Sequence, residues 1–322
     1  MTATFPAGVV GYRGFQAGDE AGLVEAWNLS LPADPTTRRW VRDRVLLDPN
    51  FDPAGLRVAV LDGRVVGCAY AVRRLVPLSP YAAGTETEAG WIPFFFVEPG
   101  IRGSGVGRRL VGEALDFLAR EGRNRVDVAG YTPNYVAPGL DLELYPQARG
   151  LLEKLGFRVV TTALAMDRSL VGYAPPSEVL ELAAKRLAEG YEVGCPADGE
   201  LPELVRFAGT GFNPDWAEAI RRFPDNERLL VVRKDGRIAG FTAYGAYQGP
   251  AERFGPFGVD PAERGTGLGK ILLHRTLARM RAEGLHGAWF LWTGEDSPAA
   301  RLYLGAGFSI TRTYHLMRWT SR

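Results

Sequence analysis

Two glycine-dense stretches contain the residue types that most clearly suggest chemistry. They read VEPGIRGSGVGRRLV at Val97–Val111 and VDPAERGTGLGKILL at Val259–Leu273, and both fit the pattern R-x-x-G-x-G. Each follows an apolar run, and apolar residues at helical spacing come after it. The first turn of a helix offers free N–H groups and partial positive charge, and glycine lets the backbone approach an anion closely. We therefore predict two phosphate-binding loops.

Two familiar phosphate-binding patterns do not fit these loops. The dinucleotide fingerprint G-x-G-x-x-G requires a third glycine where Arg108 and Lys270 stand. The P-loop pattern requires a glycine where Arg264 stands, and a serine or threonine where Ile271 follows the lysine. The loops are therefore neither a dinucleotide fingerprint nor a P-loop.

A second motif follows each loop, and together the two motifs resemble a known family. The later copy reads DSPAARLYLGAGF at Asp296–Phe308, and the earlier copy reads YPQARGLLEKLGF at Tyr145–Phe157. The pair resembles the coenzyme A loop and the N-x-x-A-x-x-L-Y-x-x-x-G-F signature of the GNAT superfamily of N-acetyltransferases. Both copies depart from the signature at its first position, and the earlier copy also lacks the tyrosine. The resemblance covers nearly the whole chain as two tandem copies.

The resemblance implies acetyl transfer from acetyl-CoA, with the strand before each loop lying along the pantetheine arm. In the two strands it assigns this contact to Phe257, Gly258 and Val259, and to Phe95, Phe96 and Val97. In the two loops it assigns coenzyme contact to Arg264, Gly265, Thr266, Gly267, Leu268, Gly269 and Lys270, and to Arg102, Gly103, Ser104, Gly105, Val106, Gly107 and Arg108. The leading arginines either contact phosphate or brace the turn. A backbone N–H of the strand is the expected oxyanion donor.

Tyr303 matches the general acid of the family, because a phenol can protonate the leaving thiolate. The alternative is a core tyrosine on an amphipathic helix. Leu152 stands at the matching position of the first half and cannot donate a proton. We therefore expect catalysis in the second half. The first half is either degenerate or uses another acid such as Tyr145, for which a packing role is the other interpretation.

The remaining candidates are less defined. Glu252, just before the strand of the second copy, is the candidate general base, and Glu88 is its counterpart. Each is otherwise a solvated loop carboxylate. Asp296 replaces the asparagine of the signature, so it either contacts the coenzyme or caps the following helix. Tyr244 and Tyr247 are candidates for lining the acceptor pocket.

The elements that would position these residues also repeat. Val58–Val72 and Leu230–Ala246 each place two apolar runs around a DGR turn, which predicts a β-hairpin. We predict an α/β (α+β) protein of two GNAT-like domains, 1–170 and 171–322, each with a mixed, mostly antiparallel sheet flanked by helices. The helix predicted at Ser177–Gly190 either links the domains or packs on the first.

The first half carries two longer connections that the second lacks. One is the segment LVPLSPYAAGTETEAG at 75–90, and the other is YTPNYVAPGLDLELYP at 131–146. Long loops in compact domains are usually functional or disordered. The aromatic residues and prolines of the second segment favour a packed loop.

Composition narrows the class of protein. The net charge of +1 argues against a nucleic-acid or membrane-surface protein, and no apolar run is long enough to cross a bilayer. The N-terminus lacks the pattern of a signal peptide. Two distant cysteines favour a reduced, cytoplasmic protein, and three histidines without ligand spacing predict no metal site. The internal duplication favours a monomer.

We therefore expect an acetyl-CoA-dependent N-acetyltransferase that modifies a primary amine of a small molecule. Tandem members of the resembled family acetylate amino sugars and thiol precursors such as the cysteinyl pseudo-disaccharide of mycothiol. The alternatives are a non-catalytic protein that binds or senses coenzyme A, and an acyltransferase with another acyl-CoA or an O-acceptor.

Overall fold

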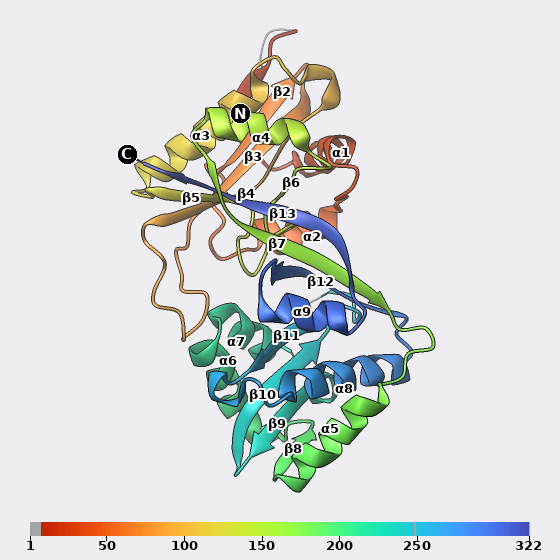
Figure 1. Cartoon of the computed structure of the whole chain (residues 1–322). Helices are drawn as coiled ribbons and strands as arrows, with labels where there is room; N and C mark the ends of the chain where they lie inside the picture. Colours follow the sequence, from red (N-terminus) through yellow and green to blue (C-terminus); the bar gives the residue numbers. More distant parts are fainter. Residues whose placement is uncertain (1–7, 224, 248, 322) are drawn as a thin grey trace. The chain divides into compact units, whose positions relative to one another are not determined.

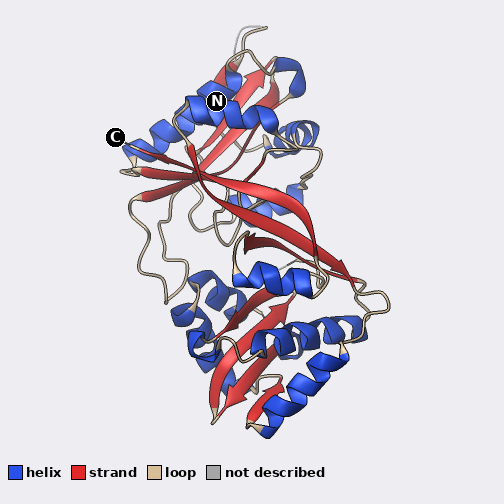
Figure 2. Cartoon of the chain, viewed as in Figure 1, coloured by secondary structure: helices blue, strands red, loops and turns tan. Residues whose placement is uncertain are grey.

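The chain forms two compact units. The computed structural model describes residues 8–223, 225–247 and 249–321 (Figure 1). Unit 1 contains the chain up to Pro77, Gly84–Ala163 and the end of the chain from Thr313, whereas unit 2 contains Leu78–Ala83 and Leu164–Arg312. Both units combine helices with strands (Figure 2), which confirms the predicted α/β (α+β) class.

Unit 1 is built on a mixed sheet. The strand order of this sheet is β1-β2-β3-β4-β5-β13-β7-β12, where β12 belongs to unit 2; neighbours are antiparallel from β1 to β4 and between β5 and β13, and β4 is parallel to β5. The elements, in order, are β1 (Gly11–Gly14), α1 (Glu20–Ser30), α2 (Arg38–Val41), the π-helix η1 (Arg42–Leu46), β2 (Leu56–Leu61), β3 (Arg64–Val72), β4 (Ala89–Val97), η2 (Pro99–Ile101), α3 (Val106–Arg120), β5 (Arg125–Val128), β6 (Leu140–Asp141), α4 (Pro146–Lys154) and β7 (Arg158–Ser169), whose residues from Leu164 belong to unit 2.

Unit 2 repeats this plan around the antiparallel sheet β11-β10-β9-β8. Its elements, in order, are α5 (Ser177–Ala188), β8 (Tyr191–Gly194), η3 (Asp198–Glu200), α6 (Leu201–Gly211), α7 (Pro214–Arg221), η4 (Asn226–Arg228), β9 (Leu229–Lys234), β10 (Arg237–Tyr244), β11 (Phe254–Val259), η5 (Pro261–Glu263), α8 (Leu268–Ala282), β12 (Gly287–Gly294), α9 (Pro298–Gly305) and β13 (Ser309–Thr320), whose residues from Thr313 belong to unit 1. The predicted mixed sheet with flanking helices is therefore confirmed in unit 1, whereas the four-stranded sheet of unit 2 is antiparallel throughout.

Alternation along β9 shows how unit 2 fills both faces of its sheet. Leu229 and Val231 pack with α6 and α7 on one face, whereas Leu230 and Val232 pack with α8 on the other. Side chains that alternate along a strand point to opposite faces, so an apolar run without polar interruption is needed here. This sandwich holds α8, and the glycine loop before it, against the sheet.

The two predicted hairpins are confirmed. β2 pairs with β3, and β9 pairs with β10, both antiparallel. Asp62 and Gly63 have φ angles of 50° and 78°, and Asp235 and Gly236 have φ angles of 50° and 74°. Two consecutive positive φ angles are typical of the tight turns that suit the twist of a hairpin, which is why Asp-Gly recurs at both turns.

The helix expected to link the domains or to pack on the first does neither. Helix α5 belongs to unit 2 and packs against α8, with Leu182 and Ala183 next to the cluster around Leu268 and Ile271. Its apolar residues recur at helical spacing, which predicted the helix but not its partner.

The segment at 131–146 is packed, as predicted. Tyr131 is 1% exposed, and its hydroxyl donates a hydrogen bond to Asp48 Oδ1 at 3.0 Å. Leu140 and Asp141 form the short strand β6, which pairs with β13. In the other longer connection, Leu78–Ala83 belongs to unit 2, where the ring of Tyr81 packs on Gly209.

Strand β13 completes the sheet of unit 1 although it lies at the end of the chain. Arg318 pairs with Asp127 of β5, and Met317, 1% exposed, packs in the core that includes Val126 and Phe157. We expect Met317→Ala to lower the free energy of unfolding of unit 1 by about 2 to 4 kcal/mol, because it leaves a cavity. Hydrogen exchange of β5 would report this loss, and exchange as slow as in the wild type would contradict it. The exposed Arg149→Ala is the control.

The remaining structural findings concern membrane-spanning helices, metal-ligating side chains and cysteines. Within the described residues, no helix is long and apolar enough to cross a membrane, and no group of three metal-ligating side chains is present. Cys68 and Cys195 are free. The domain division 1–170 and 171–322 stays a prediction, because compactness alone does not show which segments fold independently.

Candidate functional site

Both glycine loops connect a strand to the first turn of a helix, as the motif predicted. In unit 2 the loop runs from β11 to α8, with Gly265 and Gly267 at φ angles of 82° and 85°. In unit 1 the matching Gly103 and Gly105 have φ angles of 82° and 91°. These left-handed conformations favour glycine, and neither helix has a side-chain cap on its first N–H groups. A Cβ added to Gly265 or Gly103 would meet no atom within 4 Å, so the backbone there is open to a ligand.

The leading arginines of the two loops differ. Arg102 donates from Nε to Val97 O at 2.9 Å and from a terminal nitrogen to Ser30 O at 2.9 Å. It therefore braces the turn of unit 1, which was one of its two predicted roles. Arg264 is exposed, and its guanidinium makes no hydrogen bond or ion pair with the described residues. Only in unit 2 is this guanidinium free to bind an anion, and a guanidinium matches a phosphate well.

The strand before the loop of unit 2 diverges from its parallel neighbour. Among the described residues, β11 and β12 are joined by a single bridge, Arg253 with Trp289, where Trp289 N–H donates to Glu252 O at 3.0 Å. From there the edge of β11 that faces β12 is unpaired toward Val259. We call this divergence of the two strands, between Gly255–Val259 and Phe290–Gly294, the β11/β12 fork.

Two N–H groups of β11 face the fork. Asp260 N–H donates to Ala239 O of β10 at 2.8 Å. Because peptide groups alternate in direction along a strand, the N–H groups of Val259 and Phe257 point away from β10 and into the fork. Phe257 and Val259 therefore supply the kind of strand edge that pairs with amides.

Tyr303 lies on α9 beside the inner end of the fork. Its ring centre is 4.4 Å from that of Phe290 and 5.9 Å from that of Phe254. The side chain is 7% exposed, and burial raises the pKa of its phenol above the usual 10.0. Within the described residues, its hydroxyl makes no hydrogen bond. Tyr303 therefore keeps its proton at neutral pH, and no described residue accepts it.

Unit 1 lacks a phenol at the same place. Leu152 is fully buried in the core there. The hydroxyl of Tyr145, the alternative acid, donates to Asp34 Oδ2 at 2.6 Å. β4 and β5 pair from Ala89 to Ile92 and then separate, so a similar fork exists without the acid. Phe95 and Val97 lie on its edge.

The weaker candidates fall in different places. Glu252 is half-buried at the closed end of the β11/β12 fork, whereas Glu88 is exposed at the matching position of unit 1. Asp296 is exposed and does not cap α9, because the side chain of Ser297 accepts the Ala300 N–H at 3.0 Å. The capping interpretation of Asp296 is therefore wrong. Tyr244 is also wrong as a pocket residue, since it is 1% exposed and its hydroxyl donates to Glu283.

The cations after the glycine loops also differ. Lys270 lies 3.5 Å from Glu178 of α5, whereas Arg108 is exposed in the first turn of α3. Thr266 and Ser104 play matching parts, since each hydroxyl donates at 2.6 Å to the carbonyl three residues before it. The contact of α5 with this region was missed from the sequence, because no local motif connects the two segments.

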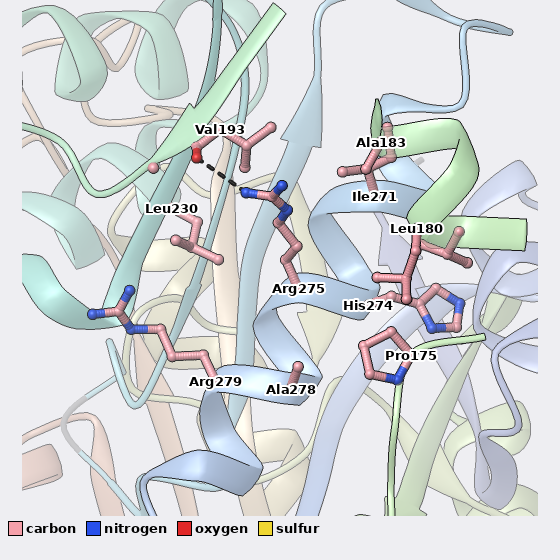
Figure 3. Close-up of a pocket in the computed structure, with 12 residues that line it drawn as sticks. Pro175, Leu180, Ala183, Val193, Leu230, Ile271, His274, Arg275, Ala278 and Arg279 are labelled. Atoms are coloured by element: carbon pink, nitrogen blue, oxygen red, sulfur yellow. Dashed lines mark hydrogen bonds between the residues drawn. The ribbon is translucent and has the colours of Figure 1, made fainter. Parts of the chain in front are cut away.

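A separate cavity of about 250 Å³ lies between α5, α8 and strands β8 and β9 of unit 2 (Figure 3). Its wall is mostly apolar, and Arg275 crosses its rim to donate a hydrogen bond to Val193 O at 3.2 Å (Figure 3). None of the predicted site residues lines it, so this cavity is distinct from the fork.

His274, in the wall of this cavity, makes the stability of unit 2 depend on pH. Burial, helped by Arg168 and Lys270 and opposed by Glu178, lowers its pKa from 6.5 to about 4, and Nδ1 lies 2.7 Å from Tyr173 Oη. From pH 7 to 5 the ring stays neutral in the folded protein but becomes protonated in the unfolded chain. We therefore expect unit 2 to lose about 1 to 2 kcal/mol over this range. Urea unfolding should show a smaller loss for His274→Gln, and equal losses would contradict this assignment.

Comparison with known proteins relates this geometry to a family. Residues 23–157 and 200–308 each match the acetyltransferase (GNAT) family. A mycothiol acetyltransferase of Thermobispora bispora is 30% identical over 320 residues, which cover 94% of this chain and 94% of that protein. Another, from Clavibacter michiganensis subsp. michiganensis, is 30% identical over 296 residues, covering 89% and 87%.

Solved structures share the fold. A GCN5-related N-acetyltransferase from Sphaerobacter thermophilus matches 97% of this chain and 95% of its own with a TM-score of 0.71 and 19% identity. A tandem GNAT protein from the clavulanic acid biosynthesis pathway matches 97% and 98% with a TM-score of 0.64 and 16% identity. The tandem GNAT architecture expected from the two motifs is thereby confirmed.

Proposed function

The chain belongs to the acetyltransferase (GNAT) family, and we propose that unit 2 transfers the acetyl group of acetyl-CoA to a primary amine of a small molecule. The observation that carries this proposal is the β11/β12 fork, with the open glycine loop at one end and the protonated Tyr303 at the other. The proposal includes the family's donor, acetyl-CoA, because the unpaired N–H groups of the loop and the free Arg264 fit a diphosphate.

Acetyl-CoA supplies a thioester, whose carbonyl carbon accepts the amine and whose thiolate leaves. The loop from Arg264 to Lys270 holds the diphosphate through backbone N–H groups and the Arg264 guanidinium. The outward N–H group of Val259 orients the arm along β11. Asp296 is exposed just before α9. It stands where the family signature has an asparagine that contacts the coenzyme, so the proposal includes Asp296 as a coenzyme contact.

The side chains of the fork divide the proton transfers between them. Glu252, at the closed end of the fork, takes the proton that the amine must lose, either directly or through a water. The Phe257 N–H stabilises the negative charge that develops on the carbonyl oxygen. Tyr303 then gives its proton to the departing sulfur, and its raised pKa keeps that proton in place until it is needed.

Unit 1 is proposed to be a partner domain without its own acetyl transfer. Leu152 replaces the acid, and Arg102 is held by two backbone carbonyls. Its open glycines Gly103 and Gly105 still leave room for a coenzyme phosphate. The proposal therefore assigns turnover to unit 2. Whether unit 1 also binds coenzyme A is measured by the stoichiometry of acetyl-CoA binding. A monomer is the proposed state.

The acceptor proposed first is the cysteinyl amine of a mycothiol precursor. The support is the 30% identity to the mycothiol acetyltransferase of Thermobispora bispora, which extends over 94% of both chains. An amino sugar, glucosamine, is the comparison amine.

The experiment follows release of coenzyme A thiol from acetyl-CoA with each amine, and mass spectrometry of the product. Hydroxylamine treatment distinguishes an amide, which survives, from an ester, which is cleaved. An amide with the cysteinyl amine is the expected result. An ester product would overturn the N-acetyl assignment, and a strong preference for propionyl-CoA would overturn the acetyl donor.

A further inference from the structure

Helix α5 runs along the glycine loop of unit 2 with one face. Glu178 lies 3.5 Å from Lys270, a Cβ on Gly267 would lie 2.7 Å from Leu182 Cδ2, and Arg186 Nε donates to Thr266 O at 2.8 Å. Glu178, Leu182 and Arg186 are four residues apart, so they share one face of the helix. All three contacts fall on the loop or on the first turn of α8.

The bond from Arg186 controls the direction of one loop N–H. In a trans peptide the carbonyl of one residue and the N–H of the next point in opposite directions. Because Arg186 holds the Thr266 carbonyl toward α5, the Gly267 N–H points away from α5. Leu182 limits the room for Gly267 on the α5 side, so the peptide cannot easily rotate.

A second anchor holds the start of the same loop. Tyr191 of β8 donates from its hydroxyl to Glu263 Oε2 at 2.6 Å, and Thr266 Oγ1 donates to Glu263 O at 2.6 Å. The loop is thus fastened on its inner side, while Arg264 stays free on its exposed side. A binding loop held in this way loses less conformational freedom when it binds.

Unit 1 provides an internal comparison. A Cβ on Gly105, the counterpart of Gly267, would meet no atom within 4 Å. The loop of unit 1 is held instead by Arg102, the residue that would otherwise be free for the anion. The glycine loop is therefore held in place by Arg186 in unit 2 and by Arg102 in unit 1.

We propose that α5 is a positioning element of the coenzyme site, with Arg186 and Leu182 as its positioning residues. They preorganise the loop N–H groups of unit 2 and thereby leave Arg264 free for the diphosphate. This inference rests on the proposed function, in that unit 2 binds acetyl-CoA. It adds a role for a helix outside both family motifs.

The main test is Arg186→Ala, with Lys185→Ala, an exposed neighbour in the same turn, as the matched control. Hydrogen exchange of the free protein should become faster over 263–270 in Arg186→Ala, and stay unchanged over 101–108 of unit 1. The Kd and KM for acetyl-CoA should rise about tenfold, as expected for one charge-assisted hydrogen bond, with kcat within about twofold. Arg186→Lys, which keeps a donor, should restore part of the affinity.

Each other result counts against the proposal. Exchange over 263–270 that is equal in Arg186→Ala and Lys185→Ala would overturn it, as would a fall in kcat without a rise in KM. If thermal unfolding shows that Arg186→Ala loses its fold, Leu182→Ala gives the same test at the neighbouring contact. If the wild type binds no acetyl-CoA, the proposed function fails, while hydrogen exchange still decides whether α5 holds the loop.

Discussion

Gly265→Asp is expected to weaken acetyl-CoA binding by unit 2 about 30- to 100-fold. The position has a φ angle of 82° and no atom within 4 Å of an added Cβ, so the new side chain would point into open space on the loop. Asp is among the residues that best tolerate this backbone conformation. Its carboxylate would stand next to the N–H groups that we assign to the diphosphate. Two like charges about 5 Å apart near a protein surface repel by a few kcal/mol.

Gly265→Asn separates charge from shape. Asn has nearly the same size as Asp and the same tolerance of positive φ but carries no charge. Gly265→Asn should therefore weaken acetyl-CoA binding only about a few-fold. Isothermal titration calorimetry with acetyl-CoA measures both variants and also gives the stoichiometry. Equal losses for Asp and Asn would mean that backbone strain, and not repulsion of a phosphate, causes the effect.

The matched changes in unit 1 are Gly103→Asp and Gly103→Asn, at the same φ angle of 82°. If unit 2 alone turns over, neither changes kcat or KM. A wild-type stoichiometry of two that falls to one in Gly103→Asp would mean that unit 1 retains a coenzyme molecule. Loss of activity in Gly103→Asp, with activity kept in Gly265→Asp, would transfer the catalytic assignment to unit 1.

The parts of the site that could be predicted from the sequence are those that depend on short motifs of neighbouring residues. The positive φ angles of Gly103 and Gly265 follow from a motif within a few positions, because only glycine adopts that conformation easily. The Asp-Gly turns of the hairpins follow for the same reason. Tyr303 could be singled out because its neighbours along α9 carry the signature.

The parts that could not be predicted depend on packing between distant segments. Arg186 reaches a carbonyl 80 residues away, and nothing in the pattern of α5 names α8 as its partner. The place of β13 in unit 1 is similar, because an alternating apolar pattern predicts a strand but not its neighbours. At α9, both Asp296 and Ser297 are good capping residues, and only the backbone geometry decides for Ser297.

Tyr303→Phe should lower kcat about 100- to 1,000-fold, the range typical of losing a general acid. The Kd for acetyl-CoA should stay within about twofold, because the loop and β11 are untouched and the aromatic ring still fills its place between Phe254 and Phe290. The fold should also be kept. The hydroxyl makes no hydrogen bond with the described residues, so its removal leaves no partner unsatisfied.

Tyr244→Phe is the control for this change, since it removes a phenol from the same unit and the same core cluster. The hydroxyl of Tyr244 donates to Glu283 at 2.9 Å, so its loss should lower the melting temperature and leave kcat unchanged. Tyr303→Phe should show the opposite combination, with stability kept and turnover lost. Equal kcat values for the two variants would remove Tyr303 from the mechanism. A lowered melting temperature with normal kcat in Tyr303→Phe would return it to the core-residue interpretation, because a buried phenol that serves only packing affects stability and not the departure of the thiolate.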